Sequence, residues 1–197
     1  MDKLNLNGKY WDQRYKNQET GWSIGYASTP ITEYINQLLD KSIKILIPGC
    51  GHGYEAEYLL NKGFENVFVL DYSEVALIEF KNRVPGFPKS NLIKDDFFNH
   101  NEHYDLIIEQ TFFCALNPSL RDDYVSHCFN LLNKNGKLIG LLFNDILNND
   151  KPPFGGNKEL YQELFDRSFK IESIENCYNS IPARKDRELF IKLIKNV

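Results

Sequence analysis

The sequence predicts an α/β protein, a Rossmann-like three-layer sandwich with a mostly parallel seven-stranded sheet whose last strand is antiparallel. Three observations predict it: seven short apolar runs lie along the chain, segments with helical periodicity separate most of them, and no helix separates the last two. Alternating strands and helices form right-handed parallel βαβ units. Two strands joined without a helix are free to pair antiparallel.

The chain starts with an aromatic-rich segment without clean periodicity, residues 1–28, and a helix is predicted over residues 28–41. Ser28 or Thr29 is its expected N-cap, Pro30 suits its first helical position, and its apolar side is expected to cover an edge of the sheet. Strands and helices then alternate, with strands at 43–48, 66–71, 91–96, 104–110 and 136–143 and helices at 54–62, 73–84 and 120–134. Short β-branched apolar runs are typical of strands buried on both faces.

The last part of the chain follows a different pattern. Residues 152–168 read as a loop and a helix, and residues 169–178 and 186–197 read as an antiparallel strand pair, although the final run alone also fits a helix. There are no repeats, no low-complexity tracts and no linker. We therefore expect residues 1–197 to form a single domain.

Composition excludes several classes of function. With 23 basic and 27 acidic residues the net charge is -4, which disfavours a nucleic-acid partner. No run approaches the ~20 apolar residues of a membrane span, and no signal peptide is recognisable. The four cysteines and four histidines are scattered without a metal-ligand pattern. We expect a cytoplasmic protein without metal or membrane partner, and a monomer or weak dimer.

The strongest local motif is a glycine loop directly after the strand at 43–48. Gly49, Gly51 and Gly53 allow positive φ and close approach of a ligand to the backbone. Asp71 follows Gly51 by 20 residues, at the end of the next strand, where a carboxylate can accept hydrogen bonds from ribose hydroxyls. Dinucleotide sites and S-adenosylmethionine sites share this arrangement, so the loop alone leaves both open.

Three further features favour S-adenosylmethionine. The sequence KDDFF, residues 94–98, places carboxylates beside aromatic rings and suits an adenine pocket, although it also fits a polar turn with a buried Phe. The chain leaves no room for a separate substrate domain. Trp11, Tyr15 and Trp22 precede the first strand and suit a cover over a cationic sulfonium, which is attracted to aromatic faces.

Several motifs together resemble one family. YWDQRYKNQETGWSIGYASTP, ILIPGCGHGYEAEYL, VFVLDYSEVAL, DDFF, TFFCALNPSLR, PPFGG and ARKDRE follow the order and spacing of the thiopurine S-methyltransferase family, and the match is closer to its halide and thiol methyltransferase branch. The resemblance implies a class I methyltransferase fold. It also implies S-adenosylmethionine as donor, with S-adenosylhomocysteine as product, and a small soft nucleophile as acceptor: a thiol, thiopurine, thiocyanate or halide.

The resemblance also assigns residues. Gln110 falls where relatives carry Tyr or Arg in contact with the cofactor, and Tyr15 departs from the Trp of many relatives. The implied cofactor-binding residues are Trp11, Tyr15, Trp22, Gly49, Gly51, Asp71, Asp95, Asp96, Phe97 and Gln110. Since methyl transfer from a cationic donor depends on alignment more than on acid–base groups, no catalytic triad is expected.

The acceptor site is less well defined by sequence. Arg184 and Arg187 are candidates for attracting an anionic acceptor, and Arg184 is preferred because it matches the family position. Phe112 and Phe113 fit a wall of the acceptor site and a place in the core equally well. The open alternatives are an oxygen or nitrogen acceptor on a metabolite or protein, a non-catalytic binding module, and a dinucleotide oxidoreductase.

Overall fold

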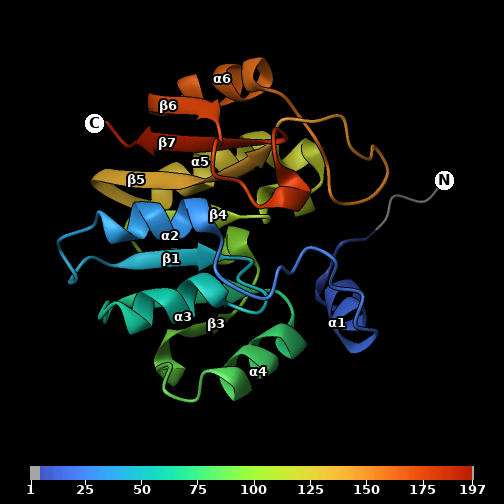
Figure 1. The fold of residues 1–197 in the computed structure, drawn as a ribbon, viewed down its shortest axis with the longest axis vertical. Coiled ribbons are helices and arrows are strands. Elements are labelled where there is room, and N and C mark those ends of the chain that lie inside the picture. The colour runs from blue at the N-terminus through green and yellow to red at the C-terminus, as the bar shows by residue number, and fades with distance from the viewer. Residues whose placement is uncertain (1–4, 197) are drawn as a thin grey trace.

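A seven-stranded sheet in the order β3-β2-β1-β4-β5-β7-β6 forms the centre of the protein (Figure 1). The computed structural model describes residues 5–196. The strands are β1 (Ile45–Pro48), β2 (Val67–Asp71), β3 (Leu92–Lys94), β4 (Tyr104–Gln110), β5 (Leu132–Phe143), β6 (Lys170–Asn176) and β7 (Glu188–Ile194). β7 pairs antiparallel with β5 and β6, and every other pair is parallel. The predicted sheet is confirmed, and the final apolar run is a strand.

Helices cover both faces of the sheet. They are α2 (Thr29–Asn36), α3 (Tyr54–Asn61), α4 (Glu74–Arg83), α5 (Arg121–Leu131) and α6 (Lys158–Asp166), whereas α1 (Gly8–Lys16) lies beside α4 at the end of the sheet. Short 3₁₀ turns are η1 (Lys89–Asn91), η2 (Phe97–Asn99), η3 (Phe113–Ala115), η4 (Pro118–Leu120) and η5 (Pro182–Arg184). Ile45 and Ile47 of β1 pack with α2, α3 and α4 on one face, whereas Leu46 belongs to the cluster of α5 and α6 on the other. This alternation gives the predicted three layers.

The strand order reverses direction at β1. β1 pairs with β2 on one side and with β4 on the other, so the chain winds outward in both directions from this point. In sheets of this kind the crevice beyond the carboxyl ends of the strands, at the reversal, receives the ligand. The glycine loop follows β1 and therefore begins at this crevice.

The aromatic segment contains a helix that the sequence pattern did not predict. Residues 8–16 form α1, and the Asn7 side chain caps it by accepting a hydrogen bond from the N–H of Tyr10 (3.1 Å). Tyr15 is its one buried residue. With a single buried position the helix has no apolar stripe, and periodicity could not reveal it.

The predicted helix after this segment exists, and Ser28 is its N-cap residue as expected, but the expected position at an edge of the sheet is wrong. α2 lies on a face of the sheet, since the ring centroid of Tyr34 is 6.0 Å from that of Phe190 on the interior strand β7. The Ser28 side chain forms no capping hydrogen bond; its N–H instead donates to Oε1 of Glu55 (3.0 Å). The helix therefore begins on a contact with α3, 27 residues away.

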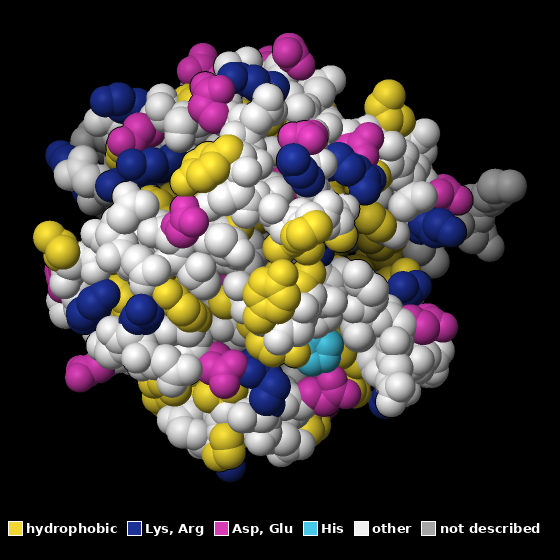
Figure 2. Space-filling view, in the orientation of Figure 1, with side chains coloured by type: hydrophobic (Ala, Val, Ile, Leu, Met, Phe, Trp, Pro, Cys, Tyr) yellow, Lys and Arg dark blue, Asp and Glu magenta, His cyan; other side chains and the backbone are white. Residues whose placement is uncertain are grey.

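The surface carries charges of both signs, interspersed over the face shown in Figure 2. Among residues 5–196, no helix is long and apolar enough to cross a membrane.

The helix predicted over residues 120–134 is shorter than expected, because α5 ends at Leu131 and β5 begins at Leu132.

Candidate functional site

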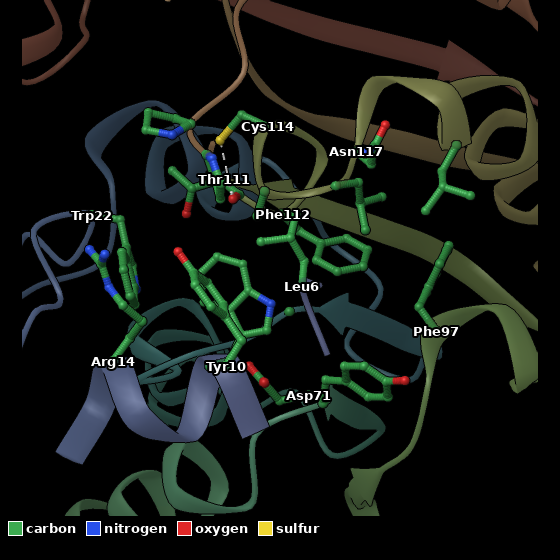
Figure 3. A pocket seen from close by; sticks show the side chains of 18 of the residues that line it. Leu6, Tyr10, Arg14, Trp22, Asp71, Phe97, Thr111, Phe112, Cys114 and Asn117 are labelled. Carbon is green, nitrogen blue, oxygen red and sulfur yellow. Dashed lines mark hydrogen bonds between the residues drawn. The ribbon is translucent and has the colours of Figure 1, made fainter. Parts of the chain in front are cut away.

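A cavity of about 680 Å³ lies beyond the carboxyl ends of the strands, between the sheet and the N-terminal segment, residues 5–28 (Figure 3). A second, smaller cavity of about 50 Å³ adjoins it and shares Trp22, Gly49 and Thr111 with it. Of the predicted site residues, the large cavity is lined by Trp11, Tyr15, Trp22, Gly49, Asp71, Asp95, Asp96, Phe97 and Arg184. Gly51 and Gln110 line the small one.

The glycine loop is held in a conformation that favours glycine. Gly49, Gly51 and Gly53 have φ of +58°, +53° and +67°. A Cβ on Gly49 would lie 2.3 Å from a ring carbon of Phe112, and one on Gly51 would lie 2.7 Å from the hydroxyl of Tyr15. These two glycines therefore also make room for the aromatic rings that wall the cavity.

Asp71 stands at the end of β2, buried but lining the large cavity. Its Oδ2 accepts from the N–H of Gly51 (2.9 Å) and its Oδ1 from the N–H of Ser73 (2.8 Å). Each carboxylate oxygen keeps a further lone pair for a ligand hydroxyl. Burial raises the pKa of Asp71 to about 6, against the effect of these hydrogen bonds.

The KDDFF motif turns the chain after β3. Asp96 caps η2 by accepting from the N–H of Phe98 (3.0 Å), and Asp95 accepts from the N–H of Asp96 (2.7 Å). Phe97 is buried, and its ring centroid lies 5.2 Å from that of Phe112. Both features weighed from the sequence are present: the carboxylates form a polar turn and also line the cavity.

The N-terminal aromatic residues pack on one another at the cavity. The Trp22 ring meets Trp11 at 5.5 Å and Tyr15 at 5.7 Å, both in edge-to-face geometry. Tyr15 also packs edge-on against His52 of the glycine loop at 5.3 Å. Figure 3 shows Trp22 and Tyr10 facing the same space as Asp71 and Phe112. The segment thus presents aromatic rings to the cavity.

Two polar contacts hold the N-terminal segment in place. Oδ1 of Asp12 accepts from the Ser73 hydroxyl (2.6 Å) and from the N–H of Val75 (3.2 Å), at the start of α4. Nη2 of Arg184 donates to the Trp22 carbonyl (2.7 Å). The segment is therefore attached to the N-terminus of α4 on one side and to the C-terminal part of the chain on the other.

Arg184 lines the cavity, as the acceptor-site prediction requires, but its guanidinium already has partners. Besides the Trp22 carbonyl, it pairs with Oε1 of the buried Glu188 at 3.4 Å. Arg187 also lines the cavity and pairs with Asp145 at 2.5 Å. Since both cations are paired with carboxylates, the attraction that they exert on an anionic acceptor is reduced.

Phe113 does not line either cavity, and the prediction that its ring walls the acceptor site is wrong. It is buried in the core, with ring centroids of Tyr124 and Tyr161 at 5.1 and 5.8 Å. Thr111 explains the difference, because its φ of +61° reverses the chain directly before the two aromatic residues. Phe112 consequently lines the cavity and Phe113 points the other way.

Gln110, at the end of β4, has a buried Oε1 atom without a hydrogen-bond partner among the described residues. Such orphaned acceptors are rare in native proteins, and this one borders the small cavity beside the glycine loop. The Gln110 side chain therefore has an unused hydrogen-bond acceptor next to the glycine loop. The sequence placed Gln110 in contact with cofactor only through the family resemblance.

The structure adds cavity residues that the sequence did not suggest. Cys114 is one; its thiol donates to the Thr111 carbonyl at 3.3 Å, and burial raises its pKa to about 12, so it is an inert neutral thiol. The others were not singled out as site residues; they lie in α1, at the end of β5 and in connecting segments, and include Leu6, Tyr10, Arg14, Leu116, Asn117, Phe143, Leu147, Pro152 and Pro153.

A cavity at the reversal point of a Rossmann-like sheet, with a carboxylate ending the second strand, is the arrangement in which α/β proteins bind nucleoside-containing cofactors. Comparison with known proteins narrows this class. The family model described as "Thiopurine S-methyltransferase" matches residues 6–193. The chain belongs to the thiopurine S-methyltransferase family, and it is a methyltransferase.

Relatives and solved structures agree with this assignment. Thiocyanate methyltransferase 1 of Arabidopsis thaliana is 29% identical over 90% of this chain and 81% of that protein. Thiopurine S-methyltransferase of Acinetobacter baylyi is 25% identical over 86% of this chain and 88% of that protein. The 1,6-didemethyltoxoflavin-N1-methyltransferase of Burkholderia thailandensis shares the fold, with a TM-score of 0.79 at 14% identity over 96% of this chain and 87% of that one.

Proposed function

We propose that the protein transfers a methyl group from S-adenosylmethionine to the sulfur of a small thiol or to another soft nucleophile. The observation that carries the proposal is the cavity of about 680 Å³, which joins Gly49 of the glycine loop, Asp71 and the aromatic segment to an apolar chamber. The family and its thiocyanate and thiopurine methyltransferase relatives support the same reaction.

The residues present fit this cofactor. Asp71 has free lone pairs for the ribose hydroxyls, and Phe97 with Asp95 and Asp96 suits the adenine. The orphaned Oε1 of Gln110 suits the ammonium of the amino-acid end. When bound, S-adenosylmethionine supplies an electrophilic methyl group on a cationic sulfur.

The part of the chain before α2 is proposed to act as a lid over the cofactor. Trp11, Tyr15 and Trp22 present aromatic rings to the cavity, and an aromatic ring near a desolvated cation contributes ~0.5 to 2 kcal/mol. The lid was predicted for residues 1–28, of which residues 1–4 lie outside the described residues. A single domain over residues 1–197, a cytoplasmic location and a monomer or weak dimer complete the proposal.

The protein's own contribution to the reaction is alignment and exclusion of water. Orienting two reactants for in-line displacement can supply ~7 to 11 kcal/mol of the barrier. The rings of Trp22, Phe112 and Phe143 line the cavity from three separate segments and limit the access of water. No acid–base group is required for an acceptor that is already anionic, and a thiol would react as its thiolate after losing its proton to solvent.

The acceptor side of the cavity favours a thiol with an apolar body over a bare ion. Apolar side chains from the segments around residues 116 and 147 line this side, and Leu116, Leu147 and Pro153 are among them. An inorganic anion gains little from such surroundings, because desolvation costs it free energy that apolar groups do not return.

Turnover measurements test the proposal. The protein is mixed with S-adenosylmethionine and, in turn, bisulfide, iodide, thiocyanate, thiophenol and a thiopurine, and S-adenosylhomocysteine and methylated product are measured. We expect methylation of at least one, with thiophenol preferred. Lack of cofactor binding in calorimetry at millimolar concentration would refute the proposed cofactor. Binding without turnover would favour an oxygen or nitrogen acceptor, or a non-catalytic module.

A further inference from the structure

We propose that Glu109 is a positioning residue that fixes the acceptor wall, the segment of residues 111–117, from behind. This inference rests on the proposed function, because it assigns the wall to the methyl acceptor. Glu109 lies in β4, directly before Gln110, and its side chain lines neither cavity. Its effect on the reaction is therefore indirect.

The Glu109 carboxylate is fully buried and accepts three hydrogen bonds. Oε1 accepts from the N–H groups of Phe112 (2.7 Å) and Phe113 (2.9 Å), and Oε2 accepts from the hydroxyl of Tyr124 on α5 (2.8 Å). Both N–H groups belong to the turn that starts at Thr111, whose φ is +61°. The carboxylate thus stabilises a backbone conformation that is unfavourable for a residue other than glycine.

The turn decides which side chains reach the cavity. The residues before and after the buried Phe113 line the cavity. They include Phe112, Cys114, Leu116 and Asn117. If the two N–H groups lost their acceptor, the turn would have to find another conformation or leave two buried donors unpaired. Either outcome moves or loosens the Phe112 ring, which also packs on Gly49 of the glycine loop.

Within residues 5–196, no lysine, arginine or histidine forms an ion pair or hydrogen bond with Glu109. The titratable groups that interact with it are the Tyr124 hydroxyl and the thiols of Cys114 and Cys128. Burial raises the pKa of Glu109 to about 7, so the neutral acid is accessible near neutral pH. Glutamine therefore imitates this residue closely: its oxygen can accept from both N–H groups, and its amide can donate to the Tyr124 oxygen.

The test compares Glu109→Ala with Glu109→Gln in the full-length protein. For Glu109→Ala we expect the KM of the methyl acceptor to rise about tenfold, while the affinity for S-adenosylhomocysteine changes by less than about threefold. Glu109→Gln should restore the acceptor KM to within about threefold of wild type. A merely structural role predicts instead a lower melting temperature with an unchanged acceptor KM in the folded fraction, and that result would overturn the proposal.

Hydrogen exchange gives a second readout that does not need turnover. In Glu109→Ala the amides of Phe112 and Phe113 should lose protection, while those of the β1 strand keep it; Glu109→Gln should resemble wild type. Unchanged protection in Glu109→Ala would refute the positioning role. If wild type methylates no acceptor but the protection pattern changes as expected, the acceptor assignment fails while the control of the turn by Glu109 stands.

Discussion

The side of the cavity proposed for the cofactor and the side proposed for the acceptor, called the cofactor side and the acceptor side below, are built differently. On the cofactor side, Gly49 and Asp71 stand directly at the ends of β1 and β2, where sheet hydrogen bonds fix the backbone. On the acceptor side, residues such as Leu116, Leu147 and Arg187 come from three connecting segments. The contrast teaches that the cofactor side is positioned by the sheet, whereas the acceptor side depends on contacts that hold loops in place.

The largest expected effect tests the cofactor side. Asp71→Ala removes the proposed ribose ligand and the acceptor for the N–H groups of Gly51 and Ser73, so affinity for S-adenosylhomocysteine should fall about 100-fold or more. Calorimetry measures it. Asp71→Asn is the matched control, since it keeps the shape and loses the charge, and thermal unfolding verifies that both variants fold. Unchanged affinity in Asp71→Ala would remove the ribose assignment.

A substitution of Arg184 distinguishes the two sides of the cavity. The sequence assigns this residue to the acceptor, whereas the structure connects it to the aromatic segment. Its hydrogen bond to the Trp22 carbonyl indicates that it holds the aromatic segment. Arg184→Met should then weaken binding of S-adenosylhomocysteine about tenfold, whereas the matched Arg187→Met should change it by less than about twofold. If Arg184→Met raises only the KM of anionic acceptors, the sequence-based role in attracting the acceptor is correct.

A pH titration tests the charge state of Asp71. Ribose hydroxyls donate to the ionised carboxylate, so affinity for S-adenosylhomocysteine should fall as pH falls through the pKa of about 6. At pH 5.5 the affinity should be about fourfold lower than at a pH where Asp71 is fully ionised. The free energy of unfolding changes with pH in the opposite direction. Because folding raises this pKa, the contribution of Asp71 to stability is greatest at low pH and is lost as pH rises through about 6. Asp71→Asn should flatten the binding profile, and a pH-dependent profile in that variant would assign the titration to another group.

The smallest expected effect lies on the acceptor side. Leu147→Ala removes part of the apolar lining without touching the glycine loop. The KM for thiophenol should rise about threefold, as expected for a half-buried apolar side chain, and the KM for iodide should stay the same. Steady-state kinetics with both acceptors provides the measurement. An equal rise in the KM values for thiophenol and iodide would indicate that the substitution displaces the loop, rather than only removing one apolar contact.

Sequence predicted the positions of the glycine loop and Asp71 in the fold because their signals are local. Three glycines after an apolar run, and a carboxylate ending the next run, fix their own positions in a parallel sheet. Helix α1 was missed because it buries only Tyr15 and has no apolar stripe. The fold of the remaining chain followed from periodicity, with errors at the ends of helices.

The acceptor side could not be predicted because it depends on contacts between distant parts of the chain. The partner of Arg184, the Trp22 carbonyl, lies 162 residues away in the sequence. The choice between Phe112 and Phe113 depends on the positive φ of Thr111, a residue type that rarely adopts it. Glu109 gave one usable signal: a carboxylate inside an apolar run, directly before a turn, requires buried partners.

The Phe112 ring occupies the space that a side chain at position 49 would need. One ring therefore borders both the glycine loop and the acceptor chamber, so a larger side chain at position 112 would press on the loop as well as on the chamber. Selectivity for new acceptors is more accessible through the segment around residue 147, which has no such shared boundary. Directed evolution of this enzyme should accordingly accumulate its useful substitutions there and spare position 112.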